Sequence, residues 1–451
     1  MKKTLISLST ALLFLSSTTQ TLVFADYAQD PNQNVYVNVD VLETVSSVDL
    51  TYVLDKALKD SHNLALLTLK YAAQGSKKGD LEQQMNEMGS ASMTPGHLPS
   101  TPAEVTNTGN PQLPNLTNPT DIAWTVMQNN AMNQMMQGMG ALAGGMNKII
   151  SSQRAQMSTA AHQLGTDGRN SLLQSDEAKA GIRLQTIAQY VQLLAQKKQL
   201  DFMNEYQVVM EKDLLKAKLF AQQGLASFDD VQTVQKTINK QKDDIATLLN
   251  NYRLGLVQLS TDIGISYDPN LVIKDIESIS VDPISETDTT TLLKASYQMK
   301  TAGNNIDEAV WETGHTVTQN TYGETYQGIN LAINGQKNEQ TKLELTKKIQ
   351  VMYNDANNAY QTVLTEQRNL NDVQADLTKM KFRYSVGVIS KHDLNKFEIK
   401  VRQNETVVAA AKLKYYMLKE KAKAMDTGFY PIILDRKLNH SFFLAKASKP
   451  S

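Results

Sequence analysis

The 451-residue sequence has no cysteine, few aromatic residues and almost no net charge. Without cysteine there are no disulfides and no thiolate metal ligands, so packing must hold the fold together. The formal net charge is −1 with both signs interspersed, which provides no basic patch, and we exclude nucleic acid as a partner. Aromatic residues make up only 6% of the chain, while Gln, Ala, Leu, Lys and Asn dominate two long tracts. This composition favours elongated helices over compact domains.

Long apolar runs are scarce as well. The chain opens with Lys2 and Lys3 and continues with LISLSTALLFLSS, and the small residues Val23 and Ala25 follow near the end of this stretch. The pattern predicts a secretory signal peptide over residues 1–25. No later window approaches the 18 apolar residues of a spanning helix. We therefore expect an exported protein of the cell envelope, in the outer membrane if the organism has one and otherwise extracytoplasmic or secreted.

Residues that carry catalysis or bind metals are scattered. The six histidines include no pair at the i, i+4 spacing that a helical zinc site prefers. One of them, His392, stands beside Asp393 and is expected to be solvated. No Gly-rich phosphate loop, nucleophile elbow or pair of carboxylates stands out. We expect no enzymatic activity, no cofactor and no bound metal.

A group of methionines raises a separate question. Its members are Met127, Met132, Met135, Met136, Met139 and Met146. Thioethers bind Cu(I), yet methionine also fills irregular apolar surfaces, and the glycines and alanines nearby favour packing over metal binding. The run 131–150 is alternatively an amphipathic segment that contacts a membrane.

Shifts in composition divide the chain. The expected segments are the signal peptide 1–25, an N-terminal arm 26–47 with the strand-like VYVNVDV, an opening helix 48–74, a Pro-rich mobile linker and Met/Gly/Ala-rich insert 75–175, a first long helical hairpin 176–264, a joint 265–288, a second opening helix with a short strand in YQGINLAI 289–339, a second long hairpin 340–426 and a C-terminal tail 427–451. The linker holds six of the eleven prolines, between residues 89 and 120.

The two hairpins are copies of each other. A shift of 163 residues aligns them without a gap for about fifty residues, and it matches the turns as well as the flanking helices. The matched turn residues are Gly224 with Gly387, Leu225 with Val388, Ser227 with Ser390, and Asp230 with Asp393. We expect each glycine to close a helix in the left-handed conformation and each serine to cap the next helix, with the aspartate near its N-terminal amides. Leu225 and Val388 are apolar residues at an exposed turn, which is unusual for a plain loop.

Heptad repeats follow both turns. Apolar residues recur every seven positions, which indicates a coiled-coil seam. The seam consists of Val231, Ile238, Ile245, Tyr252 and Leu259 in the first hairpin, and of Leu394, Val401, Val408 and Tyr415 in the second. The sequence therefore predicts an all-α fold of long antiparallel coiled-coil hairpins in two repeated halves.

These features resemble the TolC family of outer-membrane efflux proteins. The turns read GLAS and VGVIS, each followed by an aspartate, and RY precedes the second. LTYVLDKAL at 50–58 is similar to the opening helix of the family, and LLKA at 292–295 more faintly so. The resemblance covers about 300 of the 451 residues.

The resemblance implies a homotrimer in which each protomer contributes two hairpins to a twelve-helix tunnel, capped by a β-barrel in the outer membrane. It also implies that the turns meet the hairpins of a periplasmic adaptor, which is tied to a pump. The docking residues would then be Gly224, Leu225, Ser227 and Asp230 with Gly387, Val388, Ser390 and Asp393. On this interpretation the protein is a passive efflux duct.

The sequence departs from the family where the barrel strands should be. A spanning β-strand needs about 9–11 residues of alternating character, and only YQGINLAI approaches that pattern. We therefore expect little or no β-barrel. Two other classes remain open, namely a secreted helical pore-forming or adhesive protein and a structural spacer of the envelope. A spacer would tolerate charge at Leu225 and Val388.

Overall fold

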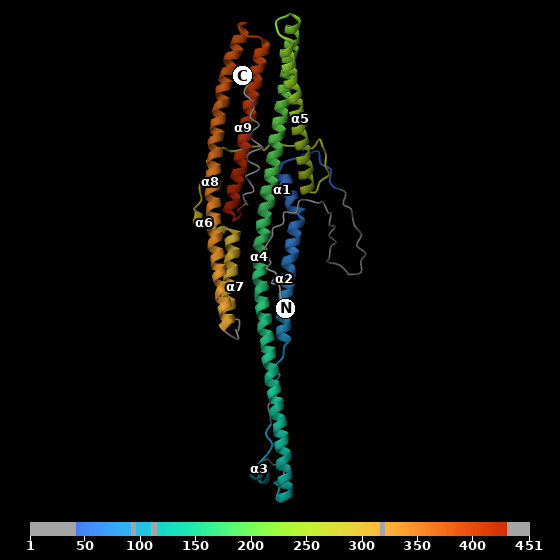
Figure 1. The fold of residues 1–451 in the computed structure, drawn as a ribbon, viewed down its shortest axis with the longest axis vertical. Helices are drawn as coiled ribbons and strands as arrows, with labels where there is room; N and C mark the ends of the chain where they lie inside the picture. Colours follow the sequence, from blue (N-terminus) through green and yellow to red (C-terminus); the bar gives the residue numbers. More distant parts are fainter. Residues whose placement is uncertain (1–41, 92–95, 110–114, 316–320, 431–451) are drawn as a thin grey trace.

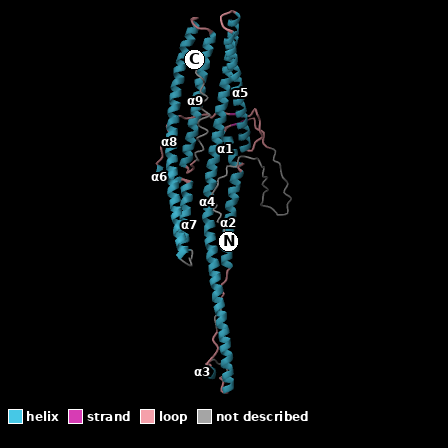
Figure 2. Ribbon diagram, viewed as in Figure 1, coloured by secondary structure: helices cyan, strands magenta, loops and turns pink. Residues whose placement is uncertain are grey.

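The computed structural model describes residues 42–91, 96–109, 115–315 and 321–430 as an elongated bundle of helices (Figure 1). The described strands are two short segments, and helices make up most of the rest (Figure 2). In chain order the elements are β1 Ser47–Val48, α1 Leu50–Lys59, α2 His62–Glu87, α3 Pro102–Thr106, α4 Pro119–Gln222, α5 Phe228–Asp262, β2 Val272–Ile273, α6 Thr289–Ala295, α7 Tyr297–His315, α8 Thr321–Ser385 and α9 Lys391–Asp426.

Some expectations fall on residues outside this description. They are the signal peptide 1–25, the strand-like VYVNVDV at 35–41 and the tail from residue 431 onward. Within the described part of the chain, no helix combines the length and apolar character that crossing a membrane requires.

The helices form two halves of the same design. In the first half, α2 and α5 pack against the long helix α4, and in the second half α7 and α9 pack against α8. The short helices that open the halves, α1 and α6, each begin after an aspartate N-cap, Asp49 and Asp288. Contacts of α4 with α7 and α9 join the halves side by side (Figure 1). The predicted all-α fold of two repeated hairpin halves is confirmed.

A two-stranded parallel sheet ties the chain before α1 to the joint after α5. Strand β1 pairs with β2 in parallel. The hydroxyl of the buried Tyr190 of α4 lies 2.6 Å from the carbonyl oxygen of Lys274, just after β2, and 3.2 Å from that of Val48 in β1, so its one hydrogen is shared between them. In the second half the Tyr415 hydroxyl donates to the carbonyl oxygen of Asp282. A buried tyrosine therefore anchors the connecting segment in each half, with its polar group satisfied.

The second half closes on itself at Gly428, just after α9. Gly428 has a φ of +101°, and its carbonyl oxygen accepts a hydrogen bond of 3.0 Å from the Tyr297 N–H. A Cβ at this position would lie 2.3 Å from the carbonyl oxygen of Ala295. Only glycine satisfies both the backbone conformation and the close approach of another main chain.

The structure corrects the prediction for residues 75–175. Helix α2 continues to Glu87, and α4 begins at Pro119 with Asn118 as its N-cap, so the first long hairpin does not start at residue 176. Helix α4 has 104 residues and is about 156 Å long at 1.5 Å per residue. The Gly and Asn content lowers the helical propensity of this stretch, but contacts with other segments of the chain override it. The opening helix 48–74 is in fact two helices, because Ser61 caps α2.

The Pro-rich linker is also corrected, since its described part lies along α4. Asn133 of α4 hydrogen-bonds the backbone N–H and C=O of Leu98, at 2.9 Å each. Asn147 does the same with Ala91, at 2.8 and 2.6 Å. Burial of apolar surface could not order this segment, but side-chain amides pair with its backbone instead. We call residues 88–91 and 96–100 the paired segment.

The prediction of a short strand in YQGINLAI is wrong, because these residues belong to α8. That helix begins at Thr321, ahead of the expected residue 340. Tyr322, Tyr326, Ile329 and Ile333 are spaced four, three and four apart, which places them on one helical face. All four are exposed. The weak alternation of apolar residues in YQGINLAI therefore reflects an apolar stripe on a helix, not a strand.

Candidate functional site

Both hairpin turns lie at the same end of the molecule, where α4 meets α5 and α8 meets α9 (Figure 1). We call residues 222–230 the first tip and residues 385–393 the second tip. The opposite end of the molecule carries the start of α4 and the short helix α3 (Figure 1). The duplication therefore places two turns of matching sequence on one surface.

The two tips have the same backbone geometry. Gly224 has a φ of +73° and Gly387 a φ of +79°, so both occupy the left-handed region that favours glycine. Each turn closes the preceding helix with two N–H to C=O bonds. In the first tip the Leu225 N–H donates to the Phe220 carbonyl (2.8 Å) and the Gly224 N–H to the Ala221 carbonyl (3.1 Å). In the second tip the Val388 N–H donates to the Arg383 carbonyl (2.9 Å) and the Gly387 N–H to the Tyr384 carbonyl (3.0 Å).

A capping box begins the next helix at each tip. The Asp230 N–H donates to Ser227 Oγ (3.1 Å) while the Ser227 N–H donates to Asp230 Oδ2 (2.9 Å). Ser390 and Asp393 repeat these bonds at 3.1 and 3.2 Å. The serine hydroxyl and the serine N–H hydrogen-bond each carboxylate and hold the pKa of Asp230 and of Asp393 below its ordinary value. The caps fix the tip backbone while both tips remain exposed.

Acid should loosen both tips. Because the pKa of each carboxyl is lowered by folding, its stabilising contribution is present above the ordinary aspartate pKa of about 3.9 and is lost as the pH falls through the lowered value. We expect hydrogen–deuterium exchange in tip peptides, corrected for intrinsic rates, to rise below about pH 4 relative to peptides from the middle of α8. Asp230→Asn should raise exchange at the first tip already at pH 7. Equal pH dependence in wild type and variant would contradict the role of the carboxylate.

The tips expose apolar side chains that no described residue covers. Leu225 and Val388 are 71% and 70% exposed. The structure adds Phe228, Phe382 and Val386, also exposed, which the sequence analysis did not single out. Their signal was available, because each lies within five residues of a tip glycine. Together these five residues give the tip end of the hairpin pair an apolar surface.

The heptad positions lie along the facing sides of the hairpin helices. The buried ones are Ile238, Leu259, Leu394, Val401, Val408 and Tyr415, and the half-buried ones are Val231, Ile245 and Tyr252. In the second hairpin, Val401 and Val408 form a core cluster with Leu370 of α8. Burial is weaker toward the first tip, where Val231 is only half-buried.

Ion pairs link the two hairpins just below the tips. Asp213 of α4 contacts Lys396 (2.8 Å) and His392 of α9. Arg402 lies 3.7 Å from Glu205 further along the same pair of helices. The expectation that His392 is solvated is wrong, because its side chain is only 18% exposed and faces Asp213. Partly exposed pairs stabilise weakly, so this link can break and reform at little cost.

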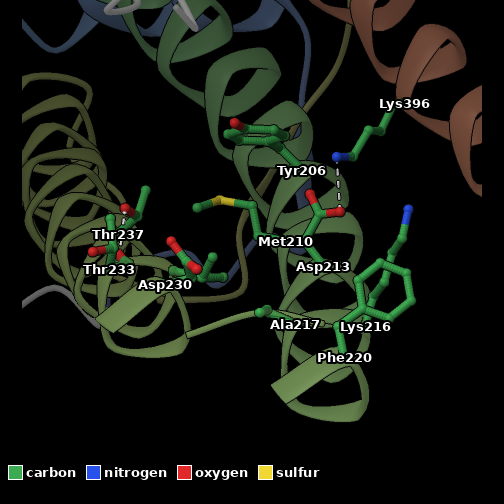
Figure 3. Close-up of a pocket in the computed structure, with 12 residues that line it drawn as sticks. Tyr206, Met210, Asp213, Lys216, Ala217, Phe220, Asp230, Thr233, Thr237 and Lys396 are labelled. Carbon is green, nitrogen blue, oxygen red and sulfur yellow. Dashed lines mark hydrogen bonds and ion pairs between the residues drawn. The ribbon is translucent and has the colours of Figure 1, made fainter. Parts of the chain in front are cut away.

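A groove of about 400 Å³ lies between these helices and the first tip (Figure 3). Its lining includes Tyr206, Met210 and Phe220 from α4, Thr233 and Val234 from α5, and Lys396 from α9. The first hairpin therefore has a groove on its side, next to the exposed apolar tip.

The methionines singled out in the sequence do not converge. All six lie on α4, and Met127 and Met146 alone are 19 residues apart, or about 29 Å along the axis. Met127, Met132, Met135 and Met146 are exposed. Among the described residues, no group of three or more His, Cys, Asp or Glu side chains is placed to hold a metal ion.

Comparison with solved structures identifies proteins that share this fold. No family model matches the sequence, and no curated protein is similar to it by sequence. Among solved structures, the outer membrane protein VceC from Vibrio cholerae aligns with a TM-score of 0.51 at 12% identity, over 85% of this chain and 97% of VceC. The outer-membrane channel OprN aligns with a TM-score of 0.51 at 10% identity, over 85% of this chain and 91% of OprN. The chain therefore has the TolC-like helical fold of outer-membrane channel proteins.

Proposed function

We propose that this protein is a passive exit duct of a cell-envelope export system. Three copies stand side by side, and their hairpins enclose a helical tunnel that a separate adaptor and pump supply with substrate. The main support is the pair of matching apolar tips on one end of the molecule, where exposed Leu225 and Val388 gain a partner that buries them. The fold shared with the outer membrane protein VceC and the outer-membrane channel OprN supports the same function.

Exposed stripes on the flanks support assembly of several copies. On α8, Tyr322 and Tyr326 are 87% and 69% exposed, and Ile329 and Ile333 continue the stripe. Apolar residues at alternating spacings of four and three are typical of helices that coil around a neighbouring helix. No other part of the described chain covers this face. A second copy in the same orientation would cover it.

Docking would use the tips of both hairpins. The adaptor would present helical hairpins of its own, with apolar residues that seat on Leu225 and Val388. The ion pairs from Asp213 to Lys396 and His392 set the spacing of the two tips, because they join α4 to α9. Breaking this weak link would let the hairpins shift and open the tunnel.

The assembly state tests this function most directly. Native mass spectrometry of the purified chain should show a homotrimer, and affinity capture from the envelope should recover a hairpin-bearing adaptor together with its pump. Vesicles mixed with the purified protein alone should retain an entrapped dye, since a duct needs its partners. A monomer that releases the dye unaided would instead identify a pore-forming protein. A protein that captures no adaptor and leaves vesicles intact would be a spacer.

A further inference from the structure

The first half contains a long extension that the second half lacks. Helix α4 has 104 residues and α8 has 65. Under the 163-residue shift, the start of α8 matches residue 158, so residues 119–157 of α4 have no counterpart in the second half. This extension runs beyond α2 to the end of the molecule opposite the tips (Figure 1).

One face of the extension is occupied by the chain itself. Asn133 and Asn147 hold the paired segment through two hydrogen bonds each. Asn129 and Asn130 add bonds to the carbonyl oxygens of Pro99 (2.6 Å) and Ser100 (3.0 Å). These amides satisfy backbone groups of a segment that is neither helix nor strand. The face is therefore polar, and it is already covered.

The opposite face is apolar, and within the described part of the chain nothing covers it. Large residues at Met135, Leu142 and Ile149 alternate with small residues at Ala131, Gly138 and Gly145, and all six are exposed. At about 100° per residue these positions fall within an arc of about 80°, roughly opposite Asn133 and Asn147. Leu142 is 71% and Ile149 61% exposed. We call these six residues the distal stripe.

We propose that the distal stripe is the seam of a parallel coiled coil formed with the same stripe in further copies of this chain. The spacing alternates between four and three residues over the whole stripe, which is the repeat of helices that coil around one another. A large residue of one copy can lie beside a small residue of the next. No atom lies within 4 Å of a Cβ built on Gly138 or Gly145, so space for a close neighbour is open.

Charge favours copies of the chain over a membrane. Residues 122–147 contain no Asp, Glu, Lys or Arg. A helix that lies on a lipid surface typically has Lys and Arg on its polar face, whereas here that face consists of asparagines already bound to backbone. Identical neutral stripes do not repel one another when copies stand side by side. The inference rests on the proposed side-by-side assembly, and it locates a contact far from the tips.

Single cysteines test the seam cleanly, because the chain has none of its own. In the full-length protein, Leu142→Cys should form covalent dimers under mild oxidation at least about tenfold faster than Gln137→Cys, because a disulfide requires close Cα atoms. Gln137 is exposed on the same part of the helix and points about 140° away from Leu142. If native mass spectrometry shows an assembled protein and the two cysteine variants cross-link at equal rates, the proposed seam is wrong but the side-by-side assembly stands. A protein that does not assemble would overturn the proposed function as well.

Trp124 reports whether lipid or protein covers this end. The chain has two tryptophans, so Trp311→Phe leaves Trp124, which is 62% exposed in a single copy, as the only emitter. The assembled protein should show blue-shifted emission without lipid, and adding Leu142→Glu should shift it to the red. A blue shift that appears only on addition of phosphatidylglycerol and phosphatidylcholine vesicles would overturn the proposal in favour of membrane contact.

Discussion

Replacing Leu225 and Val388 together by aspartate should abolish binding of the adaptor while leaving the helices intact. Both side chains are about 70% exposed, so the free protein loses no packing when they change. In the complex, each aspartate would bury a charge against an apolar partner surface without a counter-ion, which costs several kcal/mol. We expect binding to weaken by at least about 100-fold, since each 1.4 kcal/mol is worth a factor of ten.

The measurement is capture of the adaptor that the wild-type chain recovers, together with circular dichroism and the transport activity of the cell. Asn251→Asp with Gln361→Asp is a matched control, because it adds the same charges at exposed polar positions of the hairpin helices, away from the tips. That control should bind as the wild type does. Loss of helicity in the double aspartate variant would show that the tips are part of a core, and unchanged capture would favour a structural spacer.

The largest loss of stability is expected from Gly428→Ala. The added Cβ would lie 2.3 Å from the backbone oxygen of Ala295, and main chain cannot rotate away as a flexible side chain can. The φ of +101° is itself strained for any residue with a Cβ. Gly428 follows α9 and contacts the end of α6, and its carbonyl oxygen bonds the first residue of α7, so relieving the clash separates elements of the second half. We expect the free energy of unfolding to fall by about 3–5 kcal/mol.

The variant Gly387→Ala separates the effect of the positive φ from the effect of the close contact with another main chain. Gly387 also has a positive φ, at +79°, but a Cβ there would meet nothing within 4 Å. Chemical denaturation followed by circular dichroism should show a loss of only about 1–2 kcal/mol for this variant. If both alanine variants lost the same stability, the backbone conformation alone would account for the effect and the close approach at Gly428 would be irrelevant.

The tips could be predicted from the sequence because their determinants are local. A glycine, a serine three residues later and an aspartate three residues after that specify the left-handed closure and the capping box of the first tip. The repeat at 163 residues then supplied the second tip, and the heptads supplied the hairpin helices. The turn signals lie within about two helical turns of one another, and the heptads and the repeat can be read directly from the sequence.

The extension of α4 could not be predicted, because its determinants are far apart in the chain. Asn133 and Asn147 look like helix-weakening residues in a Met- and Gly-rich stretch, and their partners Leu98 and Ala91 are 35 and 56 residues away. His392 was misjudged for the same reason, since Asp213 precedes it by 179 residues. Only the folded chain brings these polar groups together. The exposed Phe228 and Phe382 were overlooked although both lie near the tip glycines.

One unbroken helix determines how far apart the two ends of this protein stand. Helix α4 runs without a break from Pro119, past the distal stripe, to the first tip, over about 156 Å. The number of residues in this helix therefore fixes the distance that the protein can span, and no flexible linker contributes to it.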